Sequence, residues 1–361
     1  MLERIRESCE HYPDRNAFYI RKTHYTYRQL AGMITAIRQT LRREKIGSGE
    51  MVGVIANDDL ETYASVFALW LEDCVFVPIS TRNPGDRNLM ILQQTSLNVI
   101  LNSHADHSCL PESMSFHILR TDIEPVEPHD IHLPPMRSDD LLYLLFTSGS
   151  TGIPKGVQIS RRNFDAFLES FIGIGYRLSP ADRFLQIYDL TFDASLHCYV
   201  LALCFGACVY TVPPDEVKYT YAMKLMRDHE LTFAKMPPST VAYLRPYFKD
   251  IHLPKMRYSL FGGEPLYADL AIEWQQCVPN AWLQNVYGPT EVTINCTYYD
   301  FIPGRKPCKS YNGIVSIGRP FGDSRAVVID GEGRPVQDGT RGELCIALWL
   351  EDCVFVPTRK P

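Results

Sequence analysis

The stretch that decides the fold is Leu141–Gly156, LLYLLFTSGSTGIPKG, in which an apolar run leads into Gly, Ser, Thr, Pro and Lys. The apolar half is short and glycines follow it, so we expect a buried strand over Leu141–Phe146. The loop behind it combines hydroxyl groups, glycines that let backbone N–H groups approach a ligand, and the mobile cation of Lys155. Such a loop suits a polyphosphate.

The P-loop template GxxxxGK[ST] does not fit, because Lys155 stands between Pro154 and Gly156. The segment instead resembles the phosphate-binding signature of the adenylate-forming superfamily: acyl-CoA synthetases, luciferases and amino-acid adenylation domains. A Ser/Thr/Gly loop without further context is more often a solvated turn. Here the order and spacing of the residues match the family signature, and this favours phosphate binding. The resemblance implies catalytic roles for Thr147, Ser148 and Lys155, and ATP or AMP binding by Gly149, Ser150, Thr151 and Gly152.

Composition narrows the class of protein. The 361 residues are 45% hydrophobic and carry a net charge of −6 without a basic stripe, so we expect no nucleic-acid partner. No signal peptide and no membrane-spanning run is evident, which predicts a cytoplasmic protein without a membrane partner. The eleven cysteines include no CxxC and favour reduced core thiols. The histidines crowded at 104–132 match no standard zinc pattern and favour a solvated connection.

The order of elements predicts an α/β protein. A helix at Tyr27–Leu41 is followed by strands at Met51–Ile55, Cys74–Pro78 and Asn98–Asn102, with helical segments between them. Strands that alternate with helices indicate βαβ units. We therefore expect a layered αβαβα architecture with two mostly parallel sheets and a small distorted β-barrel.

The segment Phe192–Ser195, FDAS, lies in a loop after an expected strand at Phe184–Tyr188 and resembles the FDxS element of amino-acid-activating members. In those members the aspartate binds the α-ammonium of the substrate, which implies this role for Asp193. A carboxylate in an apolar pocket is costly unless a cation pairs with it, so Asp193 would select an amine. A helix cap is the alternative interpretation of an isolated Asp in this context.

The second specific motif is Asn285–Glu291, NVYGPTE. By resemblance, Asn285 would bind the adenine amino group, Tyr287 would stack on the base, Thr290 would meet the α-phosphate as a catalytic residue, and Glu291 would act in catalysis and as the Mg²⁺ ligand. The segment Gly262, Gly263 and Glu264 follows an expected strand at Arg257–Phe261 and would pack beside the adenine. A turn between two strands is the simpler interpretation of YGP.

Resemblance also implies the residues that line the substrate pocket. Lys235 follows an expected strand at Phe233–Ala234 and would favour an anionic side chain, although a lysine at a strand end is usually solvated. With His197 it indicates an acidic or polar amino acid. The full set of implied pocket positions is Asp193, Ala194, His197, Lys235, Leu260, Gly262, Val286, Ile294 and Asn295.

The C-terminal stretch departs from the family pattern. Residues 1–346 resemble the large N-terminal part of an adenylation domain, but Ala347–Pro357 repeats Ala68–Pro78 without a mismatch. We interpret the tail at 347–361 as a rearrangement or a sequence-assembly event, with a functional added strand as the alternative. The C-terminal small domain of the family, with its catalytic lysine, is expected to be absent, so the chain alone should show weak adenylation.

The resemblance extends to nonribosomal peptide synthetase adenylation domains and D-alanine–carrier-protein ligases. It implies ATP-dependent formation of an aminoacyl adenylate, followed by transfer to the phosphopantetheine thiol of a carrier protein. An acyl- or aryl-acid ligase of the same superfamily is an alternative, as is a non-catalytic module that binds a nucleotide or a carrier.

Overall fold

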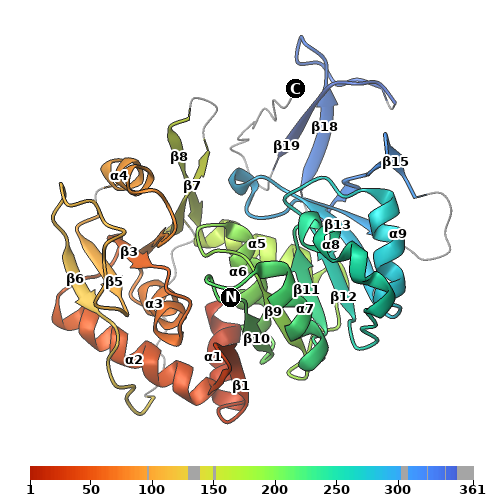
Figure 1. The fold of residues 1–361 in the computed structure, drawn as a ribbon. Helices are drawn as coiled ribbons and strands as arrows, with labels where there is room; N and C mark the ends of the chain where they lie inside the picture. The colour runs from red at the N-terminus through yellow and green to blue at the C-terminus, as the bar shows by residue number, and fades with distance from the viewer. Residues whose placement is uncertain are drawn as a thin grey trace. The chain divides into compact units, whose positions relative to one another are not determined.

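A computed structural model describes residues 1–95, 97–128, 139–148, 152–301, 308–322, 324–337 and 339–347 (Figure 1). The chain is a mixed α/β protein with two large, mostly parallel sheets and helices packed against them, as the sequence predicts. It divides into two compact units. The first unit contains Met1–Asp165 and Leu178–Lys235, and the second contains Ala166–Arg177 and the described residues from Met236 onward.

A six-stranded sheet forms one part of the first unit, in the order β6-β5-β3-β4-β7-β8. Its neighbours are parallel except for the antiparallel pair β7–β8. The bounds are β3 Met51–Ile55, β4 Val75–Ile79, β5 Val99–Asn102, β6 His117–Arg120, β7 Leu141–Ser148 and β8 Pro154–Ser160. The connecting helices α2 Tyr27–Arg43, α3 Leu60–Leu71 and α4 Gly85–Gln93 lie close to the predicted segments. Thr26 and Gln29 form a capping box at α2, and Asp59 caps α3.

Five further strands of the first unit are ordered β11-β9-β10-β1-β2. Only β1–β2 is antiparallel. The bounds are β1 Asn16–Ile20, β2 Thr23–Thr26, β9 Arg183–Gln186, β10 Cys208–Thr211 and β11 Phe233–Met236. The helices among them are α1 Leu2–His11, α6 Asp193–Leu203 and α7 Lys218–Asp228, while α5 Arg161–Ile172 contributes residues to both units.

The strands of the second unit are ordered β17-β14-β13-β12, and only β12–β13 is parallel. The bounds are β12 Tyr258–Phe261, β13 Trp282–Tyr287, β14 Thr297–Phe301 and β17 Arg319–Pro320, with helices α8 Pro238–Leu244, η1 Arg245–Asp250, α9 Ala268–Cys277 and η2 Thr290–Val292. Where a small barrel is expected, the described residues form two separate two-stranded antiparallel sheets. They are β15 Ser310–Tyr311 with β16 Ile314–Val315, and β18 Arg325–Ile329 with β19 Glu343–Ala347. The repeated tail lies outside the described residues beyond Ala347.

The turn after α3 carries two charged residues that make local contacts. Glu72 pairs with Arg38 at 2.6 Å and with Arg42 at 2.8 Å, and this ties the end of α3 to α2. Asp73 has a φ of +59°, the left-handed region that favours glycine, and accepts a hydrogen bond from Ser48. Both residues therefore contribute to packing at this turn.

Within the described part of the chain, no helix has the length and hydropathy needed to cross a membrane.

Candidate active site

The predicted phosphate-binding segment forms a pair of antiparallel strands, β7 and β8. Thr147 and Ser148 end β7, and Lys155 lies opposite Thr147 on β8. The Thr147 hydroxyl donates a 3.5 Å hydrogen bond to the Lys155 carbonyl. The hairpin is anchored below by Trp70 of α3, whose indole N–H donates to the Leu142 carbonyl at 2.8 Å. In a P-loop the phosphate-binding loop leads into the N-terminus of a helix. Here the hydroxyl groups of Thr147 and Ser148 and the amine of Lys155 belong to two extended strands.

Gly149, Ser150 and Thr151, which the sequence predicts to bind the nucleotide, lie outside the described residues. Gly152 has a φ of +81°, a conformation that L side chains rarely adopt. Lys155 is exposed, and among the described residues its amine makes no ion pair. The side chain is therefore available to a ligand.

Asp193 begins α6 instead of lying in the loop that the sequence suggests. The N-cap residue is Phe192, and Asp193 is the first acidic residue of the helical turn. The positive end of the helix dipole stabilises a carboxylate in this position. Ala194 follows in the same turn, and both side chains are half-buried.

Lys235 is 2% exposed and lies inside β11, so the simpler prediction of a solvated strand end is wrong. Its amine lies 3.0 Å from Nδ1 of His197, which is also buried. Burial lowers the pKa of Lys235 to about 8, although the Cys198 thiol and the Asp193 carboxylate oppose this effect. Burial and the Lys235 charge hold the pKa of His197 well below its usual range. Neutral His197 therefore accepts a hydrogen bond from the Lys235 ammonium.

Three buried hydroxyl groups near Asp193 were not anticipated from the sequence. Tyr143 and Tyr199 are fully buried, as is Ser195, and within the described residues their hydroxyl oxygens have no hydrogen-bond partner. Burial raises the pKa of Tyr143, and the Asp193 charge adds to this shift. Tyr143 sits in an apolar strand, where the sequence gives no signal that separates it from the core.

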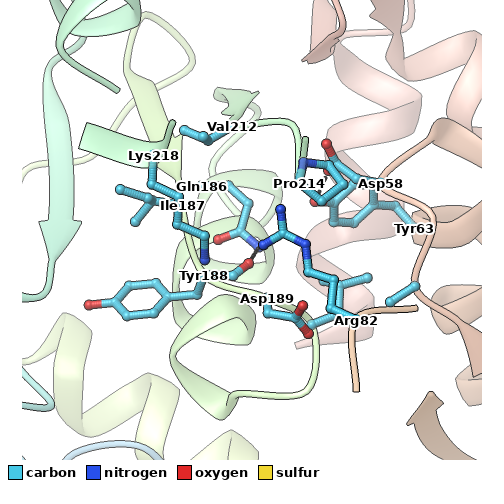
Figure 2. Close-up of a pocket in the computed structure, with 12 residues that line it drawn as sticks. Asp58, Tyr63, Arg82, Gln186, Ile187, Tyr188, Asp189, Val212, Pro214 and Lys218 are labelled. Atoms are coloured by element: carbon cyan, nitrogen blue, oxygen red, sulfur yellow. Dashed lines mark hydrogen bonds between the residues drawn. The ribbon is translucent and has the colours of Figure 1, made fainter. Parts of the chain in front are cut away.

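A pocket adjoins the segment that leads into Asp193 (Figure 2). It contains none of the sequence-predicted site residues. Arg82, Gln186 and Lys218 point into it from different elements. The other lining residues are Ala56, Asp58, Tyr63, Ile187, Tyr188, Asp189, Leu190, Val212 and Pro214.

In the second unit, the two segments that are predicted to bind adenine lie at the same edge of the sheet. Phe261 of β12 pairs with Asn285 of β13, so the glycines that follow β12 adjoin the NVY segment. The Asn285 amide N–H₂ donates to the Ser316 carbonyl at 3.1 Å, which leaves its carbonyl oxygen as an acceptor for an amino group. Gly263 has a φ of +86°.

Glu264 has a structural partner. Its carboxylate accepts hydrogen bonds from the backbone N–H and the hydroxyl of Ser239, at 2.9 and 3.0 Å. Ser239 lies in the first turn of α8, where the backbone N–H groups have no partners within the helix. Glu264 therefore fixes the start of α8 beside the glycine pair.

The YGP turn requires its glycine. A Cβ atom on Gly288 would lie 2.5 Å from Cα of Asn295 and 2.8 Å from the Ile294 carbonyl oxygen. Tyr287 ends β13, and Thr290 and Glu291 form η2 directly after the turn. Each of these three side chains is half-buried. The Glu291 carboxylate makes no ion pair or hydrogen bond among the described residues.

The remaining predicted pocket positions of the second unit are buried. Leu260 lies in β12, Val286 lies in β13, and Ile294 and Asn295 lie in the turn after η2. Ile294 has a φ of +72°, and Thr293 before it has a φ of +60°. Two consecutive β-branched residues in the left-handed region store backbone strain next to the predicted site.

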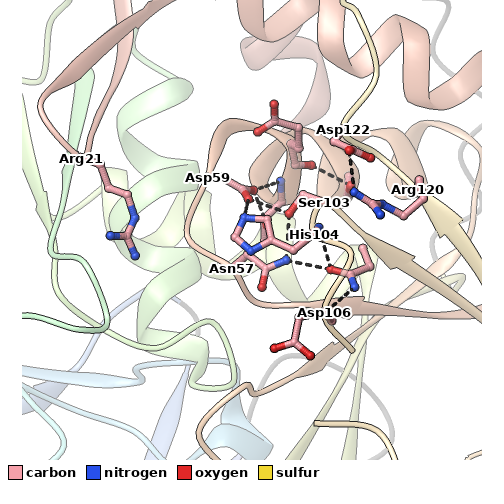
Figure 3. A network of polar contacts seen from close by, with 12 residues as sticks. Arg21, Asn57, Asp59, Ser103, His104, Asp106, Arg120 and Asp122 are labelled. Carbon is pink, nitrogen blue, oxygen red and sulfur yellow. Dashed lines mark hydrogen bonds and ion pairs between the residues drawn. The ribbon is translucent and has the colours of Figure 1, made fainter. Parts of the chain in front are cut away.

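The described histidines of the segment after β5 make local polar contacts, and Figure 3 shows those of His104. His104 lies 3.3 Å from the Asp59 carboxylate, which also accepts a 2.6 Å hydrogen bond from Ser103. The ring of His107 contacts the Ala105 carbonyl at 3.0 Å. His129 and His132 lie outside the described residues, and the described ones contain no cluster suited to a metal ion.

The architecture, with a hydroxyl-rich hairpin in one unit and the NVYGPTE turn in the other, is that of the N-terminal subdomain of adenylation enzymes. The chain belongs to the family of AMP-binding enzymes, whose family model matches residues 5–348.

The chain is 29% identical over 342 residues to the nonribosomal peptide synthetase sidE of Aspergillus fumigatus. The aligned region covers 92% of this chain and 15% of that protein. The chain is 25% identical over 345 residues to tyrocidine synthase 1 of Brevibacillus parabrevis, covering 94% of this chain and 30% of that one. The N-terminal subdomain of NpsA from Klebsiella oxytoca, solved in complex with 3-hydroxybenzoyl-AMSN, has a similar fold, with a TM-score of 0.81 and 23% identity. That match covers 96% of this chain and 86% of the solved subdomain chain. The chain thus spans less than a third of these curated relatives.

Proposed function

We propose that this protein activates an amino acid with ATP to form an aminoacyl adenylate, which then reacts with the thiol of a carrier protein. The observation that carries the proposal is the buried pair Lys235–His197 beside Asp193, at the start of α6. Adenylate formation is the chemistry of the AMP-binding family to which the chain belongs.

The charges of this site match an acidic amino acid. Asp193 would pair with the α-ammonium group of the substrate, and the buried Lys235 ammonium would interact with the substrate side chain. His197 is neutral, so Lys235 supplies the positive charge of this pair. A substrate side chain with a carboxylate, such as that of aspartate or glutamate, would bring the opposite charge to Lys235.

Activation would proceed by attack of the substrate α-carboxylate on the α-phosphorus of ATP, with pyrophosphate as the leaving group. Thr147, Ser148 and Lys155 on the hairpin would hold the leaving phosphates, and Thr290 would contact the α-phosphate. Asn285 would accept a hydrogen bond from the adenine amino group, and Tyr287 would cover the face of the base.

Mg²⁺ would supply positive charge to the phosphate oxygens. Glu291 fits as its ligand because its carboxylate is half-buried and has no hydrogen-bond or ion-pair partner among the described residues, and a hard cation prefers oxygen ligands. We also propose that residues 1–346 form the large part of the adenylation domain, and that the phosphopantetheine thiol of a carrier protein accepts the aminoacyl group.

The test measures the thermal stability of the chain with a panel of non-hydrolysable aminoacyl-sulfamoyl-adenosines, with AMP and a fatty-acyl analogue as references. A ligand at a hundredfold excess over its dissociation constant stabilises the native state by about 2.7 kcal/mol. We expect an acidic aminoacyl analogue to raise the melting temperature more than the other analogues do, and we expect Asp193→Ala to remove that difference. Asp228→Ala, at an exposed position on α7, serves as the matched control.

Other outcomes would replace the proposal. Equal shifts with AMP and with every analogue would reduce the chain to a nucleotide-binding module. A dominant fatty-acyl or aryl analogue that is insensitive to Asp193→Ala would identify an acyl- or aryl-acid ligase.

A further inference from the structure

The pocket of Figure 2 contains two cations that take no part in the ion pairs of the described residues. Arg82 lies after β4, and Lys218 is the first residue of α7. Neither side chain forms an ion pair with any described residue. The pocket is lined by strand ends and connections within the first unit, and its cavity volume is about 30 Å³. This volume admits a compact group of a few heavy atoms.

The two carboxylates in the pocket are already engaged elsewhere. Asp58 accepts hydrogen bonds from the Tyr63 hydroxyl at 2.9 Å and from the Thr211 hydroxyl at 3.2 Å. Asp189 accepts from the backbone N–H and the hydroxyl of Thr191, at 3.0 and 2.7 Å. Arg21, whose charge acts on Asp58, is paired with Asp215 at 2.8 Å. Both pocket carboxylates thus accept hydrogen bonds from neutral donors, and the charge of Asp189 acts on Lys218 without a direct ion pair.

The position of Lys218 is electrostatically unfavourable in the empty protein. Lysine at the first position of a helix opposes the helix dipole, and Val217 before it makes no side-chain capping hydrogen bond. Burial lowers the pKa of Lys218, and Arg82 adds to this shift while the charge of Asp189 opposes it. An anion bound between Arg82 and Lys218 would offset both the unfavourable helix dipole at Lys218 and the repulsion between the two cations.

The pocket also contains a buried acceptor atom, for which a ligand would have to supply a hydrogen-bond donor. Gln186 is 2% exposed, its amide nitrogen donates to the Tyr188 carbonyl at 3.0 Å, and its carbonyl oxygen has no partner in the described chain. A ligand that satisfies the pocket therefore has negatively charged oxygens for Arg82 and Lys218 and a hydrogen-bond donor for Gln186. A protonated phosphate, or a phosphate ester with a neighbouring hydroxyl or amide group, has both.

We infer that the pocket formed by Arg82, Lys218 and Gln186 binds a phosphate group, at a site separate from the residues that would hold ATP. The planar guanidinium group of Arg82 suits paired phosphate oxygens, and Lys218 supplies a point charge. The pocket wall Ile187–Leu190 leads directly into Asp193, so an occupant would contact the segment next to the carboxylate that would bind the substrate ammonium group.

The experiment uses the full chain with its nucleotide site filled by a saturating aminoacyl-sulfamoyl-adenosine. Inorganic phosphate is titrated at constant ionic strength, with chloride as the reference anion, and binding is measured by calorimetry. We expect saturable binding that Lys218→Gln and Arg82→Gln each weaken by about tenfold or more, because each removes a charged hydrogen bond. Lys224→Gln removes a lysine from the exposed face of the same helix and should leave phosphate affinity unchanged.

Two ligand sources are distinguished by comparing inorganic phosphate with 4′-phosphopantetheine and pantetheine. Tighter binding of 4′-phosphopantetheine, with none by pantetheine, assigns the site to a phosphate ester. Equal affinity for 4′-phosphopantetheine and inorganic phosphate assigns it to the phosphate group alone. Absence of saturable phosphate binding, or affinity unchanged in both pocket variants, overturns the inference. Analogue affinity is measured in every variant, so a failure here is distinguishable from a failure of the proposed activation.

Discussion

The amine of Lys235 lies 3.0 Å from Nδ1 of His197, a contact between a strand and a helix that are 38 residues apart at this point in the sequence. Both side chains are buried, and the imidazole is neutral. Burial disfavours the charged form of the ammonium group and is the main cause of its lowered pKa. This shift makes the stability of the protein depend on pH.

The first prediction concerns the pH dependence of stability. The pKa of Lys235 is lowered from its ordinary value of 10.5 to about 8 in the folded protein. Between these two values the unfolded chain binds one more proton than the folded chain, so the free energy of unfolding rises with pH. Relative to Lys235→Met, the parent should gain about 1.4 kcal/mol per pH unit between pH 8 and 10.5. Urea denaturation of both proteins across this range measures the difference, and parallel curves would contradict the buried-cation assignment.

The second prediction concerns substrate choice, and it rests on the proposed function. Lys235→Met keeps the bulk of the side chain and removes its charge. We expect at least a tenfold loss of affinity for an aspartyl-sulfamoyl-adenosine, since a charge-assisted hydrogen bond is lost, and little change for the alanyl analogue. Calorimetry measures both, with Lys224→Met as the exposed control on α7. Equal losses of affinity for the two analogues would mean that Lys235 supports the fold and does not contact the substrate side chain.

The third prediction concerns the ion pairs at the end of α3. Glu72→Gln would leave Arg38, whose side chain is 8% exposed, without its carboxylate partner. Breaking a buried pair from one side costs about 3 kcal/mol in the free energy of unfolding. Glu44→Gln is the matched control, because Glu44 makes only a 3.5 Å pair with exposed Arg43 and a 4.0 Å contact with His117. It should change stability by less than about 0.5 kcal/mol in chemical denaturation.

The fourth prediction concerns the turn that carries Thr290 and Glu291. Gly288→Ala places a methyl group against the backbone of Asn295, so the turn must shift and the cost should be about 1–3 kcal/mol. We expect weaker AMP binding as well, because Tyr287 precedes the turn directly. A Cβ atom on Gly331 would meet nothing within 4 Å, so Gly331→Ala should be silent. Full AMP affinity in Gly288→Ala would show that the turn does not position the nucleotide.

The sequence predicted most regular elements from their periodicity. For the segment from α2 to β5, amphipathic spacing and apolar strands indicated the observed βαβ order. The residue types of the phosphate segment led to the prediction that it binds phosphate. Its hairpin geometry was less evident, because Thr147 and Lys155 are aligned by strand pairing and not by any local motif.

Features that depend on long-range contacts could not be predicted. Nothing near Lys235 in the sequence indicates that it is buried, because its partner lies on α6. The loop expected around Asp193 is the first turn of α6, which has no side-chain cap to mark its start. Arg82 and Lys218 lie far apart in the chain and meet only through the fold.

The pairing of β1 with β10 has a consequence for synthesis on the ribosome. Phe18 lies opposite Val209 in a parallel ladder, so the N-terminal strand cannot acquire that neighbour until about 190 further residues have been translated. At about 5–20 residues per second, this takes on the order of 10–40 s. During this interval β1 and β2 form an isolated hairpin with an unpaired edge, which is marginally stable and prone to intermolecular pairing. Yield in a heterologous host should therefore respond to expression temperature and to chaperones that act on nascent chains.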